Sequence, residues 1–113
     1  DGQIRGAFAQ GLGAALMEEF RYGPDGSFQS GTFADYLVPT ACEVPDPVIV
    51  HLETPSPFTP LGAKGVGEAG TTGSVPTLAN AVMDALRPMG VNHVDFPLTA
   101  ARIWKAIKNS KAA

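Results

Sequence analysis

The chain has 113 residues, of which 44% are hydrophobic and 17% are charged, a balance typical of one globular domain rather than a disordered segment. Its net charge of −3 argues against nucleic acid as the main partner, because phosphate binding requires a clustered basic face. No apolar run approaches the ~20 residues that a transmembrane helix needs. The 13 glycines and 10 prolines require much of the backbone to be turn or loop.

The single cysteine and the first residue bear on where the protein works and whether the chain is whole. Cys42 cannot form an internal disulfide, which favours a reducing compartment, and we expect the cytoplasm. The chain opens at Asp1, directly before a helical pattern and without an initiator Met. We therefore expect a fragment, a processed chain or an excised domain.

Residues 2–20 are predicted to form the first helix. Apolar side chains recur there in steps of three and four, which places them on one face: Ile4, Phe8, Leu12, Ala15, Leu16 and Phe20. Gly6, Gly11 and Gly13 each weaken a helix by up to ~1 kcal/mol relative to alanine. The close approach of another backbone or of a bulky ligand is the physical reason to keep them.

The middle of the chain reads as extended segments and loop. A turn is predicted at residues 22–26, followed by an extended stretch over residues 27–38. The β-branched residues of 48–54, with proline on both sides, predict a strand. No periodicity survives in residues 55–73, which we expect to form a long loop rich in glycine and proline.

A second helix is predicted after this loop. Ser74 can cap it, with Pro76 in its first turn. Its apolar positions share a face, and Pro88 and Gly90 end it; they are Leu78, Ala79, Val82 and Leu86.

The C-terminal part is predicted to hold a short strand and a last helix. Residues 93–96 form the strand, and Thr99 caps the helix, in which Ile103, Trp104 and Ile107 are spaced to pack inward. Helices and strands mix without a regular βαβ rhythm, so the predicted fold class is α+β.

The glycine-rich loop contains the most informative motif. Residues 65–70 fit the pattern G-x-G-x-x-G, which marks a dinucleotide-binding loop when a strand precedes it and a helix starts within it. Here prolines precede it instead, and a carboxylate inside the loop would repel a pyrophosphate, so that match is accidental. A different role suits Glu68, because flanking glycines let a large ligand approach closely and leave the carboxylate partly removed from water, as a general base requires. The alternative is an ordinary solvated loop residue.

Three segments resemble a known family. Residues 61–86, LGAKGVGEAGTTGSVPTLANAVMDAL, resemble the active-site segment of the molybdenum hydroxylases, which include xanthine dehydrogenase, aldehyde oxidoreductases and aerobic carbon monoxide dehydrogenases. The opening GQIRGAFAQGLGAALMEEF and the ending HVDFPLTAARIWKAI resemble two further family segments in the same order. The resemblance is to the C-terminal part of the large, molybdopterin-binding subunit, over nearly all of residues 1–113, and it is closest to the carbon monoxide dehydrogenase-like branch.

The resemblance implies roles for individual residues. Glu68 matches the family's catalytic base, which takes a proton from a molybdenum-bound hydroxyl as its oxygen attacks the substrate carbon. Gln3 matches the glutamine that hydrogen-bonds the pterin, and an amide can donate and accept at once. Lys64, Gly65 and Val66 match backbone near the pterin, although a solvated lysine is the alternative for Lys64. No residue is expected to bind the metal directly.

The resemblance also implies an assembly. The cofactor would be molybdopterin with molybdenum, in the cytosine dinucleotide form, held only in the assembled subunit. The partners would be the remainder of the large subunit and iron–sulfur and flavin subunits or domains. The substrate would be carbon monoxide, an aldehyde or an N-heterocycle. The isolated chain is expected to be inactive and to present apolar surface on residues 2–20 and 55–73. It is therefore expected either to self-associate or to show the loop 55–73 disordered.

The remaining candidates are interpreted as structural. Cys42 has no histidine nearby, so a small buried apolar role is expected. His51 and His93 lie on predicted strands without the spacing of a metal site, and Trp104 is expected to fill a core or an interface. The alternative function, from another class, is a freestanding binding or scaffold domain that keeps the fold without the chemistry.

Overall fold

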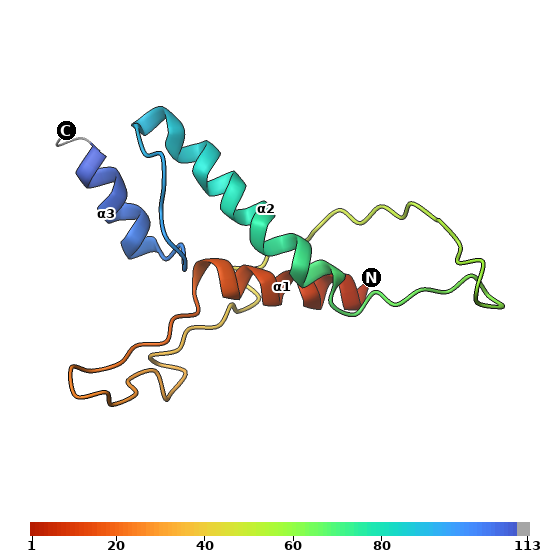
Figure 1. Ribbon diagram of the computed structural model, residues 1–113, viewed down its shortest axis with the longest axis horizontal. Coiled ribbons are helices and arrows are strands. Elements are labelled where there is room, and N and C mark those ends of the chain that lie inside the picture. The colour runs from red at the N-terminus through yellow and green to blue at the C-terminus, as the bar shows by residue number, and fades with distance from the viewer. Residues whose placement is uncertain (111–113) are drawn as a thin grey trace.

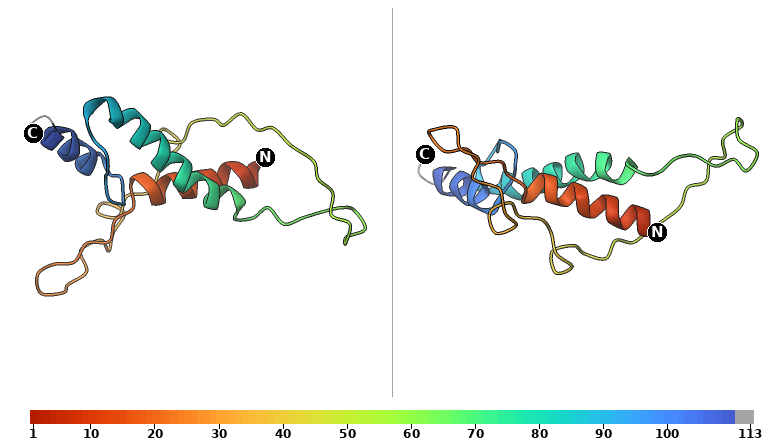
Figure 2. Two further views of the ribbon diagram at one scale, coloured as in Figure 1. Left: turned by 45° about the horizontal axis from the view of Figure 1, so that its top comes forward. Right: turned by 90° about the horizontal axis from the view of Figure 1, so that it is seen from below.

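The computed structural model describes residues 1–110, which form three α-helices and long irregular connections (Figure 1). Helix α1 spans Gly2–Leu16, α2 spans Ala69–Leu86 and α3 spans Ala100–Ser110, with a 3-10 turn η1 at Arg87–Met89. The radius of gyration is 17.9 Å, whereas a compact chain of this length would have about 13 Å. The connection between α1 and α2, residues 17–68, forms two long loops on different sides of the helices, and these loops cause the extension (Figures 1 and 2).

Helix α1 begins where the sequence predicts and ends earlier, at Leu16 rather than residue 20. The backbone N–H groups of Met17 and Glu18 both donate to the carbonyl of Gly13, at 2.9 Å each. This shared acceptor closes the helix and turns the chain away. A side chain at Gly13 would also collide with Pro39, since an added Cβ would lie 2.9 Å from its Cδ.

Small residues let α1 and α2 cross at close range. A Cβ added at Gly11 would lie 2.5 Å from the Cβ of Ser74, and one added at Gly70 would lie 2.7 Å from the Cβ of Ala7. The Thr71 hydroxyl donates to the Ala7 carbonyl across the same contact, at 3.0 Å. The expected close backbone approach is therefore confirmed at Gly11.

Helix α2 starts five residues before the predicted cap, at Ala69, so the prediction that Ser74 caps it is wrong. Ser74 lies buried inside the helix, and its hydroxyl donates to the Gly70 carbonyl one turn earlier. Packing of the first turn on α1 favours the helical conformation there, and tertiary packing outweighs local capping preference. Pro76 is accommodated within the helix.

Helix α3 is attached to the end of α1. The N–H of Leu98 donates to the carbonyl of Ala15 at 2.8 Å, and the Leu98 side chain is only 2% exposed. The Thr99 cap is confirmed, because the N–H of Arg102 donates to its hydroxyl at 3.4 Å. The small core along these helices comprises Ala7, Leu12, Ala15, Leu86, Val91 and Leu98.

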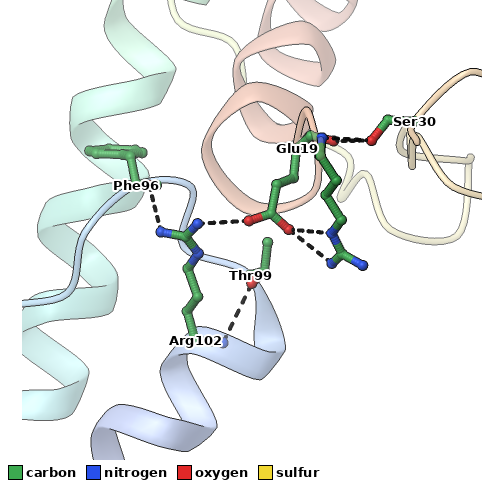
Figure 3. A network of polar contacts seen from close by, with 6 residues as sticks. Glu19, Ser30, Phe96, Thr99 and Arg102 are labelled. Carbon is green, nitrogen blue, oxygen red and sulfur yellow. Dashed lines mark hydrogen bonds and ion pairs between the residues drawn. The ribbon is translucent and has the colours of Figure 1, made fainter. Parts of the chain in front are cut away.

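An ion-pair network closes the junction of α1 and α3 (Figure 3). Arg102 donates to the Glu19 carboxylate at 2.7 Å and to the Phe96 carbonyl at 2.9 Å. The same carboxylate accepts from Arg21, and Ser30 donates its hydroxyl to the Glu19 carbonyl. Hydrogen bonds from Arg102 first, then from Arg21, hold the pKa of Glu19 below its ordinary value of 4.5.

The predicted strands are not formed within residues 1–110. Residues 27–38, 48–54 and 93–96 have no ladder there, and the one β contact is an isolated antiparallel bridge between Tyr22 and Phe28. A strand requires a neighbour to accept its backbone hydrogen bonds. Within residues 1–110, residues 48–54 and 93–96 form no backbone–backbone hydrogen bond, and the pairing of residues 27–38 with residues 21–23 involves only Ser27 and Gln29. The strand component of α+β is thus not confirmed, and the described chain is helices plus irregular backbone.

Several side chains expected inside are exposed. Cys42 is exposed, so its predicted burial is wrong, and Trp104 is exposed with the Lys108 amine 5.1 Å from its ring centre. Ile103 and Ile107 are partly buried, as predicted. His51 and His93 lie on irregular backbone, where each contacts an aspartate, rather than on strands.

The expected apolar surface is confirmed. Phe20, Phe58 and Leu61 are among the exposed large side chains, together with many on the loops. Self-association stays a prediction. None of the helices in residues 1–110 combines the length and apolar character required to span a membrane.

Because α1 and α2 cross at close range, replacing glycine by alanine should have opposite effects on stability at Gly11 and at Gly73. Gly11→Ala should destabilise the fold by about 1–3 kcal/mol, because the new methyl would overlap Ser74. Gly73→Ala, in the same helix pair but with no atom within 4 Å of an added Cβ, should stabilise it by about 0.5–1 kcal/mol. Urea unfolding of both variants compares them; equal effects would show that the crossing is not tightly packed.

The Glu19 network predicts a pH-dependent stability. A lowered carboxyl pKa stabilises the fold above the unfolded value near 4.5, and this contribution disappears as pH falls through the lower folded value. Arg102→Gln should therefore lower the free energy of unfolding at pH 7, measured by urea unfolding. The loss should be no more than about 1 kcal/mol because Arg102 is 40% exposed. The deficit should shrink below pH 4.5.

Lys105→Gln is the matched control, since it removes the same charge from an exposed position of α3. Its effect should be small at both pH values. A deficit of Arg102→Gln that persisted unchanged in acid would contradict the assigned role of Glu19.

Candidate functional site

A hollow of about 520 Å³ lies where the start of α1 faces the start of α2. It is open to solvent on the outer side of both helices, and its walls are mostly small or polar. They are formed by Gly2, Gln3, Gly6, Ala7, Gln10, Gly67, Glu68, Thr71 and Thr72. The fold thus brings together Gln3, from the first turn of α1, and Glu68, from the end of the long connection that leads to α2.

Gln3 lies in the first turn of α1, on the side that faces the glycine-rich loop. Its side-chain nitrogen donates to the carbonyl of Gly67 at 3.5 Å, the long limit for such a bond. The amide therefore touches the backbone next to Glu68. Among the described residues no group donates a hydrogen bond to its side-chain oxygen, and the residue is exposed.

Glu68 immediately precedes α2, and the helix fixes its backbone. Its carbonyl accepts hydrogen bonds from the N–H of Thr72 at 3.0 Å and from the Thr72 hydroxyl at 3.1 Å. The carboxylate caps no backbone N–H of the helix and is exposed. The expected partial removal of Glu68 from water is therefore wrong for the described chain, because nothing in it covers the hollow.

The glycines of the two helices divide into two classes. Gly11, Gly13 and Gly70 are needed for packing, since an added Cβ would collide. Gly2 and Gly6 line the hollow, and an added Cβ at either would meet no atom within 4 Å. The chain's own packing does not require glycine at Gly6, although it costs helix stability there. An unfilled, glycine-lined wall is suited to a bulky group from outside the chain.

Lys64, Gly65 and Val66 lie apart from this hollow. They line a second one of about 490 Å³, formed together with residues of 50–55 and Gly62. The Lys64 amine donates to the Thr54 hydroxyl at 2.6 Å, within that second hollow. The structure thus brings Gln3 and Glu68 together and leaves the other three predicted contacts on the adjoining limb of the loop.

Two residues of the hollow were missed by the sequence interpretation. Thr71 and Thr72 line it and hold the loop, through bonds to Ala7 and Glu68 respectively. The sequence pattern places both threonines in the loop of residues 55–73, because it predicts that the helix starts at Ser74. A helix started directly after Glu68 would have placed both threonines in its first turn, facing α1.

The chain is similar to known molybdopterin-binding proteins. A model described as a molybdopterin cofactor-binding domain matches residues 1–45. The chain is 41% identical, over its whole length, to the carbon monoxide dehydrogenase large chain of Hydrogenophaga pseudoflava. It is 40% identical, over 96% of its length, to the nicotine 6-hydroxylase large subunit of Paenarthrobacter nicotinovorans. The chain is a relative of the molybdenum hydroxylase large subunits.

The solved structures agree. Carbon monoxide dehydrogenase from Oligotropha carboxidovorans superposes with a TM-score of 0.90 at 37% identity, over 98% of this chain and 14% of that one. The chain spans 14% of the Hydrogenophaga protein and 13% of the nicotine hydroxylase subunit. The resemblance found in the sequence is confirmed, and it concerns about one seventh of each relative.

The residues around the hollow fit a pterin cofactor. Gln3 offers an amide that can donate and accept, and Gly2 and Gly6 leave the wall open. The described residues contain no cluster of three or more histidine, cysteine or acidic side chains able to hold a metal ion. The donor set is thus suited to hydrogen-bonding an organic group rather than to ligating a bare metal.

Proposed function

We propose that this chain is the C-terminal segment, residues 1–113, of a molybdopterin-binding domain in the large subunit of a molybdenum hydroxylase. In this role it supplies the catalytic base and part of the cofactor contacts. The observation that carries the proposal is the meeting of Gln3 and Glu68 in one glycine-walled hollow. The family resemblance assigns these two residues as pterin contact and base, and they line one hollow although a long loop separates them in the sequence.

Glu68 is the proposed general base. The molybdenum–pterin group, when bound, supplies the oxidising centre and an oxygen derived from water. The Glu68 carboxylate would accept a proton beside that group, and hydrogen bonds from Thr72 to the Glu68 carbonyl fix its backbone. An ionised carboxylate is acceptor-only and well suited to take up a proton. Covering of the hollow by the rest of the subunit would remove Glu68 from water and strengthen it as a base.

Gln3 is the proposed pterin contact, with Lys64, Gly65 and Val66 contributing backbone on the approach to Glu68. The contact between Gln3 and Gly67 links both groups, so a cofactor held by the amide would lie beside the carboxylate. Lys64 is bonded to Thr54, which leaves its backbone rather than its amine as the group offered to a ligand. This agrees with the backbone role that the resemblance implies.

The remaining features of the assembly follow from the relatives. The Hydrogenophaga and Paenarthrobacter relatives are named as a large chain and a large subunit, which supports iron–sulfur and flavin partners. We propose the cytosine dinucleotide form of the cofactor and a cytoplasmic enzyme. One relative is named for carbon monoxide and another for nicotine, so the proposed substrate class stays carbon monoxide, an aldehyde or an N-heterocycle.

Replacing the base tests the proposal most directly. In the assembled enzyme, Glu68→Gln should keep the fold and the molybdenum content and lose about 10²–10⁴-fold in turnover, because an amide cannot accept the proton. Gln3→Ala should instead lower molybdenum content and activity together, because it loosens the pterin. Molybdenum analysis beside the steady-state rate for each variant separates the two roles.

Asp84→Asn is the matched control, since it removes an exposed carboxylate from α2, the helix that Glu68 immediately precedes. Its turnover should equal that of the unmodified enzyme. If Glu68→Gln retained full turnover at full molybdenum occupancy, Glu68 would be an ordinary loop carboxylate and the non-catalytic scaffold would be the better interpretation.

The small share of the cofactor site in this chain leads to a further prediction. The chain provides one open wall, so the purified 113-residue chain should bind no molybdenum cofactor. Elemental analysis after expression in cells that make the cofactor checks this. Stoichiometric molybdenum in the isolated chain would show that its own residues hold the pterin.

A further inference from the structure

Residues 48–54 form an extended segment whose backbone groups have no partners in the described chain. Pro47 and Pro55 bound it, and within residues 1–110 it takes part in no backbone–backbone hydrogen bond. The nearest such bond, from Ser56 to the Gly62 carbonyl at 2.9 Å, lies just beyond it. Seven residues therefore offer a row of unused donors and acceptors.

The side chains of this segment alternate in the way that a strand requires. Val48, Val50 and Leu52 fall on one face at a spacing of two, and they are 92%, 77% and 91% exposed. The opposite face touches the chain itself, because Ile49 is partly buried and the His51 ring lies 3.3 Å from the Asp1 carboxylate. One face is thus anchored on the start of α1, and the apolar face is left uncovered.

We propose that residues 48–54 become a β-strand by pairing with a strand edge in the remainder of the large subunit, whose side chains also cover Val48, Val50 and Leu52. An extended segment with unused backbone groups and an alternating apolar face is the form that adds to a sheet edge. The partner strand would lie in the part of the large subunit outside this chain, since this chain spans only 14% of one relative. The inference rests on the proposed function, which makes that remainder the partner.

This pairing would hold the limb of the loop that leads to Glu68. Lys64 is bonded to Thr54, and Gly62 to Ser56, so residues 62–66 are attached to the end of the proposed strand. At the other end, Asp46 forms an ion pair with Arg5 of α1. In Figure 1 the loop between α1 and α2 otherwise projects away from the helices. Docking of the strand therefore fixes the approach to Glu68 from outside the chain.

Hydrogen exchange in the intact large subunit tests the proposal. Backbone amides of residues 48–54 should exchange on the order of 100-fold more slowly than in an unstructured peptide. Protection of every second amide identifies an edge strand, and protection of all of them a central one; both support the proposal. Exchange at the unprotected rate in a subunit that contains its molybdenum would overturn it.

Proline substitutions provide a second test on the same subunit. At an edge, only one of Val50→Pro and His51→Pro removes a donor that faces the partner, and that variant should speed exchange of residues 62–66 at least several-fold. Val50→Thr, which keeps the N–H and the β-branched shape, is the control. Unchanged exchange in both proline variants would again reject the strand.

The outcome is separable from that of the proposed function. Exchange reports backbone pairing, whereas Glu68→Gln reports the base. Protected amides with full turnover of Glu68→Gln would remove the catalytic role and keep the strand. Unprotected amides together with lost turnover of Glu68→Gln would keep the catalytic role and reject the strand.

Discussion

The close crossing of α1 and α2 is the constraint on which the rest of the structure depends. It requires the absence of a side chain at Gly11 and Gly70, because a Cβ at either would lie within 2.7 Å of the facing residue. The crossing buries Ala7 and Ser74 between the helices and sets the distance between the two N-terminal ends. Those ends carry Gln3 and Glu68, so a packing requirement several residues away fixes the geometry of the candidate site.

The same pair of helices also separates glycines that serve the fold from glycines that serve something else. Gly11 and Gly70 close the contact, while Gly2 and Gly6 leave an open wall that no described residue fills. Keeping glycine on an uncrowded helical face costs helix stability. That cost is reasonable where a ligand or another polypeptide approaches the backbone, which links the local composition of α1 to the proposed cofactor contact.

The described chain leaves much of its apolar surface uncovered. Its core is small, its radius of gyration exceeds that of a compact domain, and large apolar side chains project from both long loops. These surfaces are consistent with an element that is covered on several sides by the remainder of a large subunit. Helix α3 is the exception, because the Leu98–Ala15 bond and the Glu19–Arg102 pair attach it within the chain.

The sequence by itself determined the helical periodicity of α1, the cap at Thr99 and the family, through motifs that depend on local spacing and residue type. It also identified Gln3 and Glu68 as candidates, through the resemblance. Only the tertiary structure decided that α2 starts at Ala69, that Thr71 and Thr72 line the hollow, and that Lys64 lies apart from it. The strand predicted at residues 48–54 shows most clearly what the sequence alone does not determine. Its alternating pattern is a local property, but a strand is formed by hydrogen bonds to a neighbour, and within the described chain there is none.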